Sequence, residues 1–246
     1  CNHVDEEKSD FDNTIEQAKE RFGRKVTVVQ YPYNQGVDFN AIIDVHTMVM
    51  YQFGADGGKP EKLPIPESEM AKAQQLHNEL IEAIAENDEG LMEKFFEKGT
   101  LEEDEMVKGM MLSIRHHELF PVFVASAKHN MGSGRIMGFI DKCCPSAAHM
   151  KPEKLTNGQD LPCNTSNPTI AFVFKTVSEP HLGDMSFFKV CSGKVTAGID
   201  LNNTNTGSPE RMTQLFILQG KKRENVNELN AGDIGATVKL KKTHTN

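Results

Sequence analysis

The stretch Leu119-Phe120-Pro121-Val122-Phe123-Val124-Ala125 is an apolar run that leads directly into the polar tripeptide Ser126-Ala127-Lys128. A short apolar run bounded by polar residues is typical of a buried strand. Residues 133–143 follow with the apolar spacing of a helix. These patterns therefore predict a buried strand followed by a helix.

Four residues at the start of the chain, Asn2-His3-Val4-Asp5, form a second recognisable pattern. In guanine-binding sites the acid of an Asn-Lys-x-Asp box accepts hydrogen bonds from the ring N1–H and the exocyclic amine, a pair of donors that adenine does not present. A Ser-Ala-Lys sequence offers a backbone N–H to the guanine carbonyl. The two patterns together predict a base-reading site, with candidate residues Asn2, His3, Asp5, Ser126, Ala127 and Lys128.

The sequence lacks the pattern that would bind the phosphates of a nucleotide. No Gly-x-x-x-x-Gly-Lys-Ser/Thr string occurs in the 246 residues, so no loop supplies the nest of N–H groups, the lysine and the magnesium-binding hydroxyl. No convincing Asp-x-x-Gly is placed to hold magnesium either. Because the chain begins inside a recognition box, we expect a fragment that neither binds GTP tightly nor hydrolyses it, with no catalytic residue and no metal ligand of its own.

Composition and charge limit the classes of protein to consider. The 246 residues are 38% hydrophobic and 25% charged, which fits a globular protein of two domains. Without a long apolar run or a signal peptide, we expect a cytoplasmic protein with no membrane contact. Residues 1–166 hold 17 Lys and Arg against 28 Asp and Glu, whereas residues 167–246 hold 10 against 7. The second part is therefore the better candidate for binding nucleic acid.

The five cysteines do not form a disulfide pattern. Their odd number and scattered positions favour reduced thiols. A zinc site from Cys143, Cys144, Cys163 and His149 is conceivable, but it lacks Cys-x-x-Cys spacing. We therefore expect no metal.

Periodicity divides the chain into a mixed part and an all-strand part. In the first part we predict helices at 11–22, 89–97, 102–117 and 133–143, a further helix with Ser68 as its N-cap, and strands at 25–31, 39–45, 48–53 and 119–125. Residues 145–167 are rich in Pro, Asn, Thr and Ser and read as a linker. Beyond it we predict strands at 169–176, 184–191, 194–202, 214–219 and 236–240, which indicates a small β-barrel.

The chain resembles bacterial elongation factor G, a translational GTPase, over nearly its whole length. The resemblance rests on the guanine box Asn2–Asp5 and the helix after it, the segment Asn78–Phe95, the strand that ends in Ser126-Ala127, and barrel segments such as Phe187-Phe188-Lys189-Val190 and Ala231-Gly232-Asp233-Ile234. It implies an α/β GTPase-domain portion with an α+β inserted subdomain, followed by an all-β translation-factor barrel. The implied domains are 1–24 and 119–145 for the GTPase domain, 25–118 for the insertion, 146–167 for a linker, and 168–246 for an incomplete barrel.

The resemblance also implies partners. The family acts on the ribosome in protein synthesis, where it promotes movement of tRNA and mRNA; the barrel meets small-subunit ribosomal RNA and the insertion meets the stalk protein. Arg211, Lys222 and Arg223 are the candidate RNA contacts, and GTP or GDP with Mg²⁺ is the cofactor of the full-length protein. We expect a monomer that does not bind DNA.

One departure from the family leaves alternatives open. His3 replaces the box lysine, whose longer side chain covers the guanine ring, so guanine affinity should be lower. The chain could belong to a diverged paralogue that promotes translocation, to a ribosome-binding paralogue that has lost GTP dependence, or to a recycling or ribosomal-protection factor.

Overall fold

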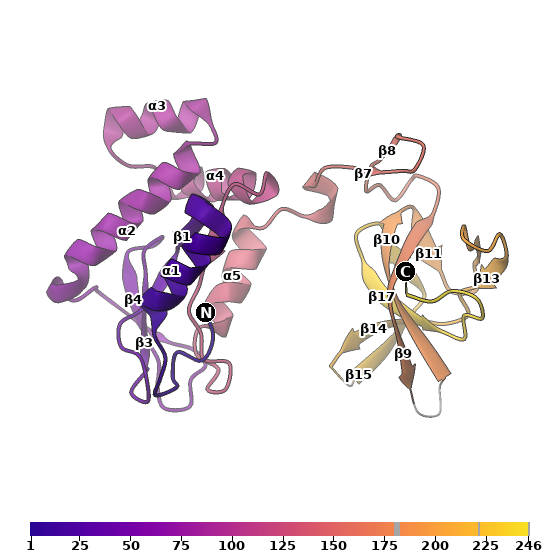
Figure 1. Cartoon of the computed structure of the whole chain (residues 1–246), viewed down its shortest axis with the longest axis horizontal. Helices are drawn as coiled ribbons and strands as arrows, with labels where there is room; N and C mark the ends of the chain where they lie inside the picture. Colours follow the sequence, from indigo (N-terminus) through magenta and orange to yellow (C-terminus); the bar gives the residue numbers. More distant parts are fainter. Residues whose placement is uncertain (180–182, 221, 246) are drawn as a thin grey trace. The chain divides into compact units, whose positions relative to one another are not determined.

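The computed structural model describes residues 1–179, 183–220 and 222–245. The chain forms two compact units, Cys1–Pro145 and Ser146–Asn246 (Figure 1). The first unit mixes helices and strands, and the second consists almost entirely of strands. This agrees with the predicted change from mixed structure to strands along the chain.

The first helix, α1 (Phe11–Phe22), has the bounds that the sequence predicts. The Asp10 side chain accepts a hydrogen bond from the Asn13 N–H at 3.0 Å, which caps the start of the helix. Gly23, with φ 74°, ends it and donates its N–H to the Lys19 carbonyl. Both signals are local, and a single turn (Gly23–Lys25) leads from the helix into the first strand.

Strands of the first unit form two sheets. β1 (Val26–Val28) pairs in parallel with β6 (Phe120–Val122). The other sheet is antiparallel in the order β2-β3-β4-β5, with bounds Gln30–Pro32, Ala41–Asp44, Val49–Gln52 and Glu61–Leu63. The single strand predicted at 25–31 is therefore wrong, because the backbone changes sheets at Val29. The Val29 N–H bonds to Val122 O, whereas Val29 O accepts from Val45 N–H, both at 3.0 Å.

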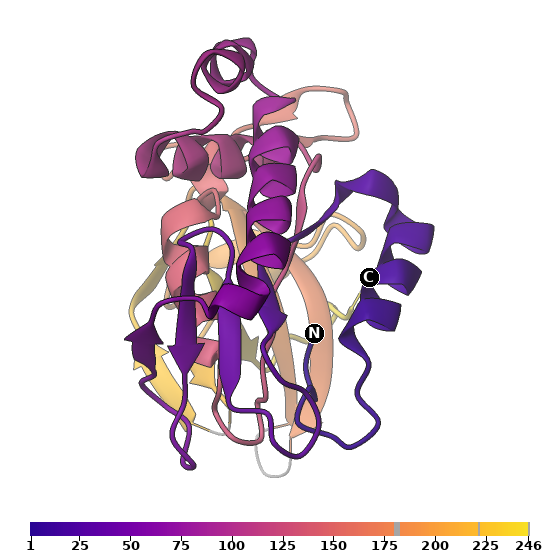
Figure 2. The same cartoon turned by 90° about the vertical axis from the view of Figure 1, so that its left-hand side faces the viewer.

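Four further helices cover these strands: α2 (Glu67–Ala85), α3 (Glu89–Lys98), α4 (Glu103–Arg115) and α5 (Ser133–Cys143). In Figures 1 and 2, α3 and α4 lie together at one end of the unit, and α1 lies apart from them on its flank. Gly109 lets α4 approach α2, because a Cβ there would lie 2.2 Å from Ile84 Cγ2. The predicted N-cap Ser68 is wrong: Pro66, with φ −59°, precedes the first helical residue, so Ser68 falls inside the first turn.

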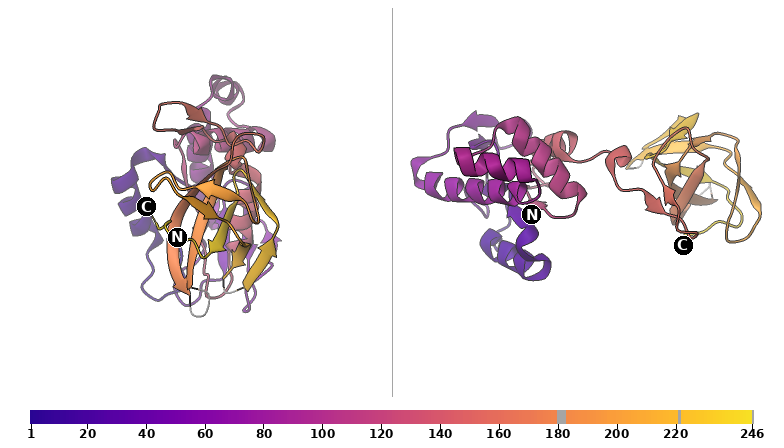
Figure 3. Two further views of the ribbon diagram at one scale, coloured as in Figure 1. Left: turned by 90° about the vertical axis from the view of Figure 1, so that its right-hand side faces the viewer. Right: turned by 90° about the horizontal axis from the view of Figure 1, so that it is seen from above.

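The second unit is organised around one five-stranded antiparallel sheet in the order β15-β14-β17-β10-β9. Its strands are β9 (Ile170–Glu179), β10 (Gly183–Ser192), β14 (Leu215–Gln219), β15 (Lys222–Val226) and β17 (Ile234–Val238). Short pairs complete the unit, namely β11 (Lys194–Thr196) with β16 (Glu228–Asn230), and β12 (Asp200–Asn202) with β13 (Pro209–Arg211). Both views in Figure 3 show these strands curving round one another.

Two predictions about this unit need correction. The strand predicted at 194–202 is two strands, β11 and β12, because Gly198 turns the chain between them with φ 86°. Residues 146–167, predicted as a linker, contain a turn at Ala147–His149 and the small hairpin of β7 (Glu153–Lys154) and β8 (Asp160–Leu161). These residues belong to the compact body of the second unit.

Candidate functional site

The start of the chain lies alongside the end of strand β6, so the two predicted base-reading segments meet. The Cys1 backbone nitrogen donates to the Phe123 carbonyl at 2.7 Å, and the Ala125 N–H donates to the Cys1 carbonyl at 2.9 Å. The Ala127 N–H then donates to Asn2 Oδ1 at 3.0 Å. Asn2 and Ala127 are therefore hydrogen-bonded partners although they stand 125 positions apart in the sequence.

Residues 126–131, which we call the base loop, are closed by backbone hydrogen bonds. The Ser126 N–H donates to Met131 O at 3.0 Å, and the Met131 N–H returns a bond to Ser126 O at 2.9 Å. The Ser126 hydroxyl also accepts from the His129 N–H at 3.3 Å. Ser126 is buried whereas Ala127 and Lys128 are exposed. The serine thus shapes the loop, and the two residues after it are accessible to a ligand.

Asp5 is the acidic group of the site, and its side chain is only 8% exposed. Burial raises the pKa of its carboxyl, but hydrogen bonds from the Ser126 hydroxyl and from the backbone N–H of Asp5 oppose this effect. The charges of His129 and Lys128 act in the same direction as these bonds, so the pKa lies below its usual range. Asp5 is therefore an ionised acceptor at neutral pH, as reading guanine N1–H and its amine requires.

The structure adds one residue that sequence reasoning missed. His129 Nε2 lies 3.5 Å from Asp5 Oδ2, close to the acceptor that a guanine would need. The available signal was its place directly after Lys128 in the same loop. His3 behaves differently: its side chain is exposed, its φ is 63°, and its carbonyl accepts the Glu6 N–H at 3.1 Å.

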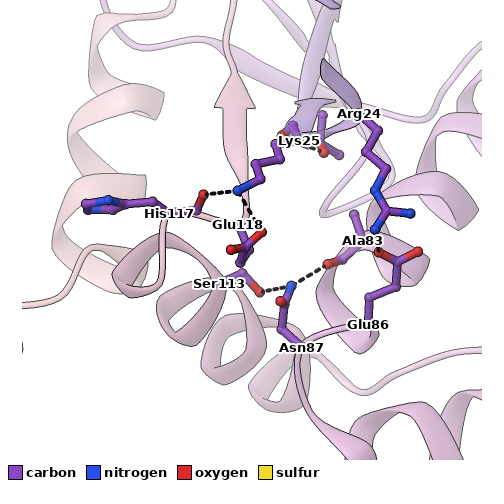
Figure 4. Close-up of polar contacts among 9 residues, drawn as sticks. Arg24, Lys25, Ala83, Glu86, Asn87, Ser113, His117 and Glu118 are labelled. Atoms are coloured by element: carbon purple, nitrogen blue, oxygen red, sulfur yellow. Dashed lines mark hydrogen bonds and ion pairs between the residues drawn. The ribbon is translucent and has the colours of Figure 1, made fainter. Parts of the chain in front are cut away.

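The predicted insertion leaves and rejoins the rest of the first unit at a polar junction (Figure 4). Lys25 Nζ lies 2.8 Å from Glu118 Oε2 and 3.0 Å from the His117 carbonyl oxygen. The hydrogen bond from Lys25 lowers the pKa of Glu118. Beside them, Asn87 Nδ2 donates to Ser113 Oγ and to the Ala83 carbonyl, both at 3.1 Å. Lys25 thus ties the two ends of the predicted insertion to each other, and Asn87 separately ties the end of α2 to α4.

The candidate RNA contacts lie on two different elements. Arg211 is on β13, and Lys222 and Arg223 are on β15; all three are exposed. β13 and β15 belong to different sheets and lie apart in Figure 1. Adjacent strand residues face opposite sides of a sheet, so Lys222 and Arg223 point to different faces. The structure does not bring the three cations together into one patch.

Within the described residues, no three His, Cys, Asp or Glu side chains come together in a way that could hold a metal ion. None of the helices in the same ranges has both the length and the apolar character needed to cross a bilayer. All five cysteines are free thiols.

Comparison with known proteins shows what the chain is similar to. Residues 168–246 match the family model described as elongation factor G domain 2. Elongation factor G of Mycoplasma genitalium is 29% identical over 251 residues, which cover 99% of this chain and 36% of that protein. A crystal structure of a protein from Thermus thermophilus has the same fold, with a TM-score of 0.80 and 23% identity, covering 99% of this chain and 34% of the other.

These matches show the class of protein that the chain resembles, the translation elongation factors. More specifically, residues 168–246 match the model of elongation factor G domain 2, and the resemblance of the whole chain to elongation factor G is confirmed. The chain spans about a third of the length of the relative and of the solved structure that it matches.

Proposed function

We propose that this chain forms part of an elongation factor G-like translational GTPase that acts on the ribosome in the cytoplasm and promotes movement of tRNA and mRNA. The observation that carries the proposal is the convergence of Asn2, Asp5 and Ala127 at one edge of the first unit. These residues offer a side-chain amide, an ionised carboxylate and a backbone N–H, which suit the polar edge of guanine.

Each group would have a distinct task in binding the base. Asp5 would accept from the guanine N1–H and amine, and the Asn2 amide would donate to the ring. The Ala127 N–H would donate to the guanine carbonyl, in competition with Asn2 Oδ1, which accepts it in the free site at 3.0 Å. The phosphates and Mg²⁺ carry most of the ligand's charge and would be held by residues outside these 246, because the phosphate-loop pattern is not in this sequence.

Replacing Asp5 tests the base-reading proposal. In the full-length protein, Asp5→Asn puts a donor where guanine needs an acceptor, and GDP affinity is expected to fall about 100-fold while ADP affinity is unchanged. Isothermal titration with both nucleotides measures the ratio of GDP affinity to ADP affinity. Asp12→Asn is the matched control, because Asp12 is 74% exposed on α1. An unchanged ratio in Asp5→Asn would contradict the assignment.

A ribosome-binding paralogue without GTP dependence is the second candidate, favoured by His3 at the position of the box lysine. The same titration separates the two functions. A full-length protein that sediments with ribosomes but does not bind GDP would support the second candidate and exclude the first.

The ribosomal contacts follow from the charge of the two units. The cationic residues of unit two would meet small-subunit ribosomal RNA, whereas residues 25–118, part of the acidic first unit, would meet the stalk protein. Lys and Arg side chains that neutralise RNA phosphates release counterions, so binding to RNA should weaken as the salt concentration rises.

Charge reversal tests the RNA contacts. The double change Lys222→Glu with Arg223→Glu is expected to weaken ribosome binding about tenfold at moderate salt and to reduce the salt dependence. Arg211→Glu is tested separately, because β13 lies apart from β15. Lys151→Glu, an exposed cation of the same unit, is the control. Sedimentation over a salt series that shows no difference from Lys151→Glu would rule out these contacts.

A further inference from the structure

The connection between β4 and β5 reaches the base loop. We call residues 54–58 of this connection the glycine loop. The Gly58 N–H donates to the Asn130 carbonyl at 3.0 Å. Gly57 packs so closely that a Cβ there would lie 1.8 Å from the His129 carbonyl oxygen. Its φ of 65° is also one that other residues rarely adopt. Only glycine fits this position, for both reasons.

This contact supports the part of the base loop that faces the base. The base loop is closed at its ends by the Ser126–Met131 pair, and the glycine loop supports its middle at His129 and Asn130. The Asn130 N–H in turn donates to the Ala127 carbonyl at 3.3 Å. A displacement at His129 would therefore move both the Ala127 N–H and the imidazole that lies against Asp5.

The contact between the glycine loop and the base loop has a pocket next to it. The volume of this pocket is about 530 Å³, and its lining includes Gly58, Lys59 and Pro60 from the β4–β5 connection and Asn130, Ser133 and Gly134 from the base loop and the start of α5. The two loops are thus not packed together broadly. Besides this contact, the Arg135–Asp44 ion pair at 3.3 Å links the same sheet to helix α5.

We propose that the glycine loop is a positioning element for guanine recognition and that Gly57 is its decisive residue. This proposal rests on the proposed function of the base-reading site. Its regulatory consequence is that a partner which moves the β4–β5 hairpin changes guanine affinity, and that guanine changes the affinity for that partner by the same factor. Residues of the insertion thereby act on the base without touching it.

Three glycine-to-alanine changes in one loop provide the test. Gly57→Ala introduces the clash with His129; Gly58→Ala introduces only an unfavourable φ, since its Cβ would meet nothing within 4 Å; Gly54→Ala introduces neither. In the 246-residue chain, we expect amide hydrogen exchange of Met131 to be at least about tenfold faster in Gly57→Ala and unchanged in Gly54→Ala. Equal exchange in these two variants would overturn the proposal.

The second measurement uses the full-length protein and the ratio of GDP to ADP affinities. Gly57→Ala should lower this ratio about tenfold, with an intermediate effect for Gly58→Ala and none for Gly54→Ala. A loss of stability alone would weaken both nucleotides equally and leave the ratio unchanged. If the unaltered protein binds GDP through Asp5 but Gly57→Ala keeps the ratio, the positioning role is wrong. If the unaltered protein does not bind GDP, the proposed function itself fails.

Discussion

Asp44→Ala is expected to lower the free energy of unfolding of the first unit by about 3 kcal/mol. Asp44 is 2% exposed at the end of β3. Its Oδ1 accepts from the Thr47 N–H and hydroxyl at 2.9 and 3.0 Å. Its Oδ2 accepts from Gln30 Nε2 at 2.8 Å and faces Arg135 Nη2 at 3.3 Å. Alanine would leave the amide and the guanidinium without their acceptor.

The position of Arg135 explains why Asp44→Ala should lower the free energy of unfolding so much. Its side chain is only 33% exposed, and its guanidinium lies 4.3 Å from the centroid of the Tyr51 ring. Removing Asp44 therefore leaves a partly buried cation without the carboxylate that faces it. The same ion pair joins the antiparallel sheet to α5, so its loss also weakens the support of the base loop.

Tyrosine fluorescence in urea can measure this effect in the first unit alone. All three tyrosines, at positions 31, 33 and 51, lie in that unit, and the chain has no tryptophan. Asp44→Asn keeps an oxygen for Thr47 and should cost about half as much. Asp12→Ala removes an exposed ion pair with Lys72 and should cost less than about 1 kcal/mol. If Asp44→Ala and Asp12→Ala lowered the free energy of unfolding equally, the hydrogen bonds and ion pair of Asp44 would contribute no more than an exposed ion pair.

Local signals explain which elements the sequence could predict. Helix α1 has its cap residues, Asp10 and Gly23, next to its own ends, so its bounds were predictable. The bounds of β1 and β6 depend on a partner strand far along the chain, and within the strand predicted at 119–125 the segment Phe120–Val122 forms β6. The short polar strand β15 was missed because its exposed residues carry no apolar alternation.

In the candidate site, too, some residues could be predicted from local sequence and others could not. Asn2, Asp5 and Ala127 could be identified because each lies in a motif that the family resemblance made recognisable. His129 and Gly57 could not, because their importance depends on distances to Asp5 and to a carbonyl oxygen in another loop. A pattern in one sequence records which residue types stand near one another in the chain, whereas these contacts arise from the packing of separate elements.

In the second unit, Glu210→Ala is expected to lower the free energy of unfolding by about 2 to 3 kcal/mol. Glu210 is 8% exposed on β13. Its carboxylate accepts from the Lys241 N–H at 3.1 Å, from the Lys242 N–H at 2.5 Å and from the Thr243 hydroxyl at 3.4 Å. These three bonds hold residues 241–243 against β13, and alanine would leave two partly buried N–H groups without an acceptor.

Glu210 and Arg211 are neighbours on β13, and we expect substitutions at Glu210 to affect stability and a substitution at Arg211 to affect RNA binding. Calorimetry should show a lower melting temperature of the second unit, which contains no tyrosine, in Glu210→Ala. Amide hydrogen exchange at Lys241 and Lys242 should be faster in the same variant. Glu210→Gln keeps one acceptor oxygen and should cost about 1 kcal/mol. Because adjacent strand residues face opposite sides, the exposed Arg211 is not part of this network. Arg211→Ala should therefore leave the melting temperature unchanged and weaken only ribosome binding, and a destabilised Arg211→Ala would contradict this division of roles.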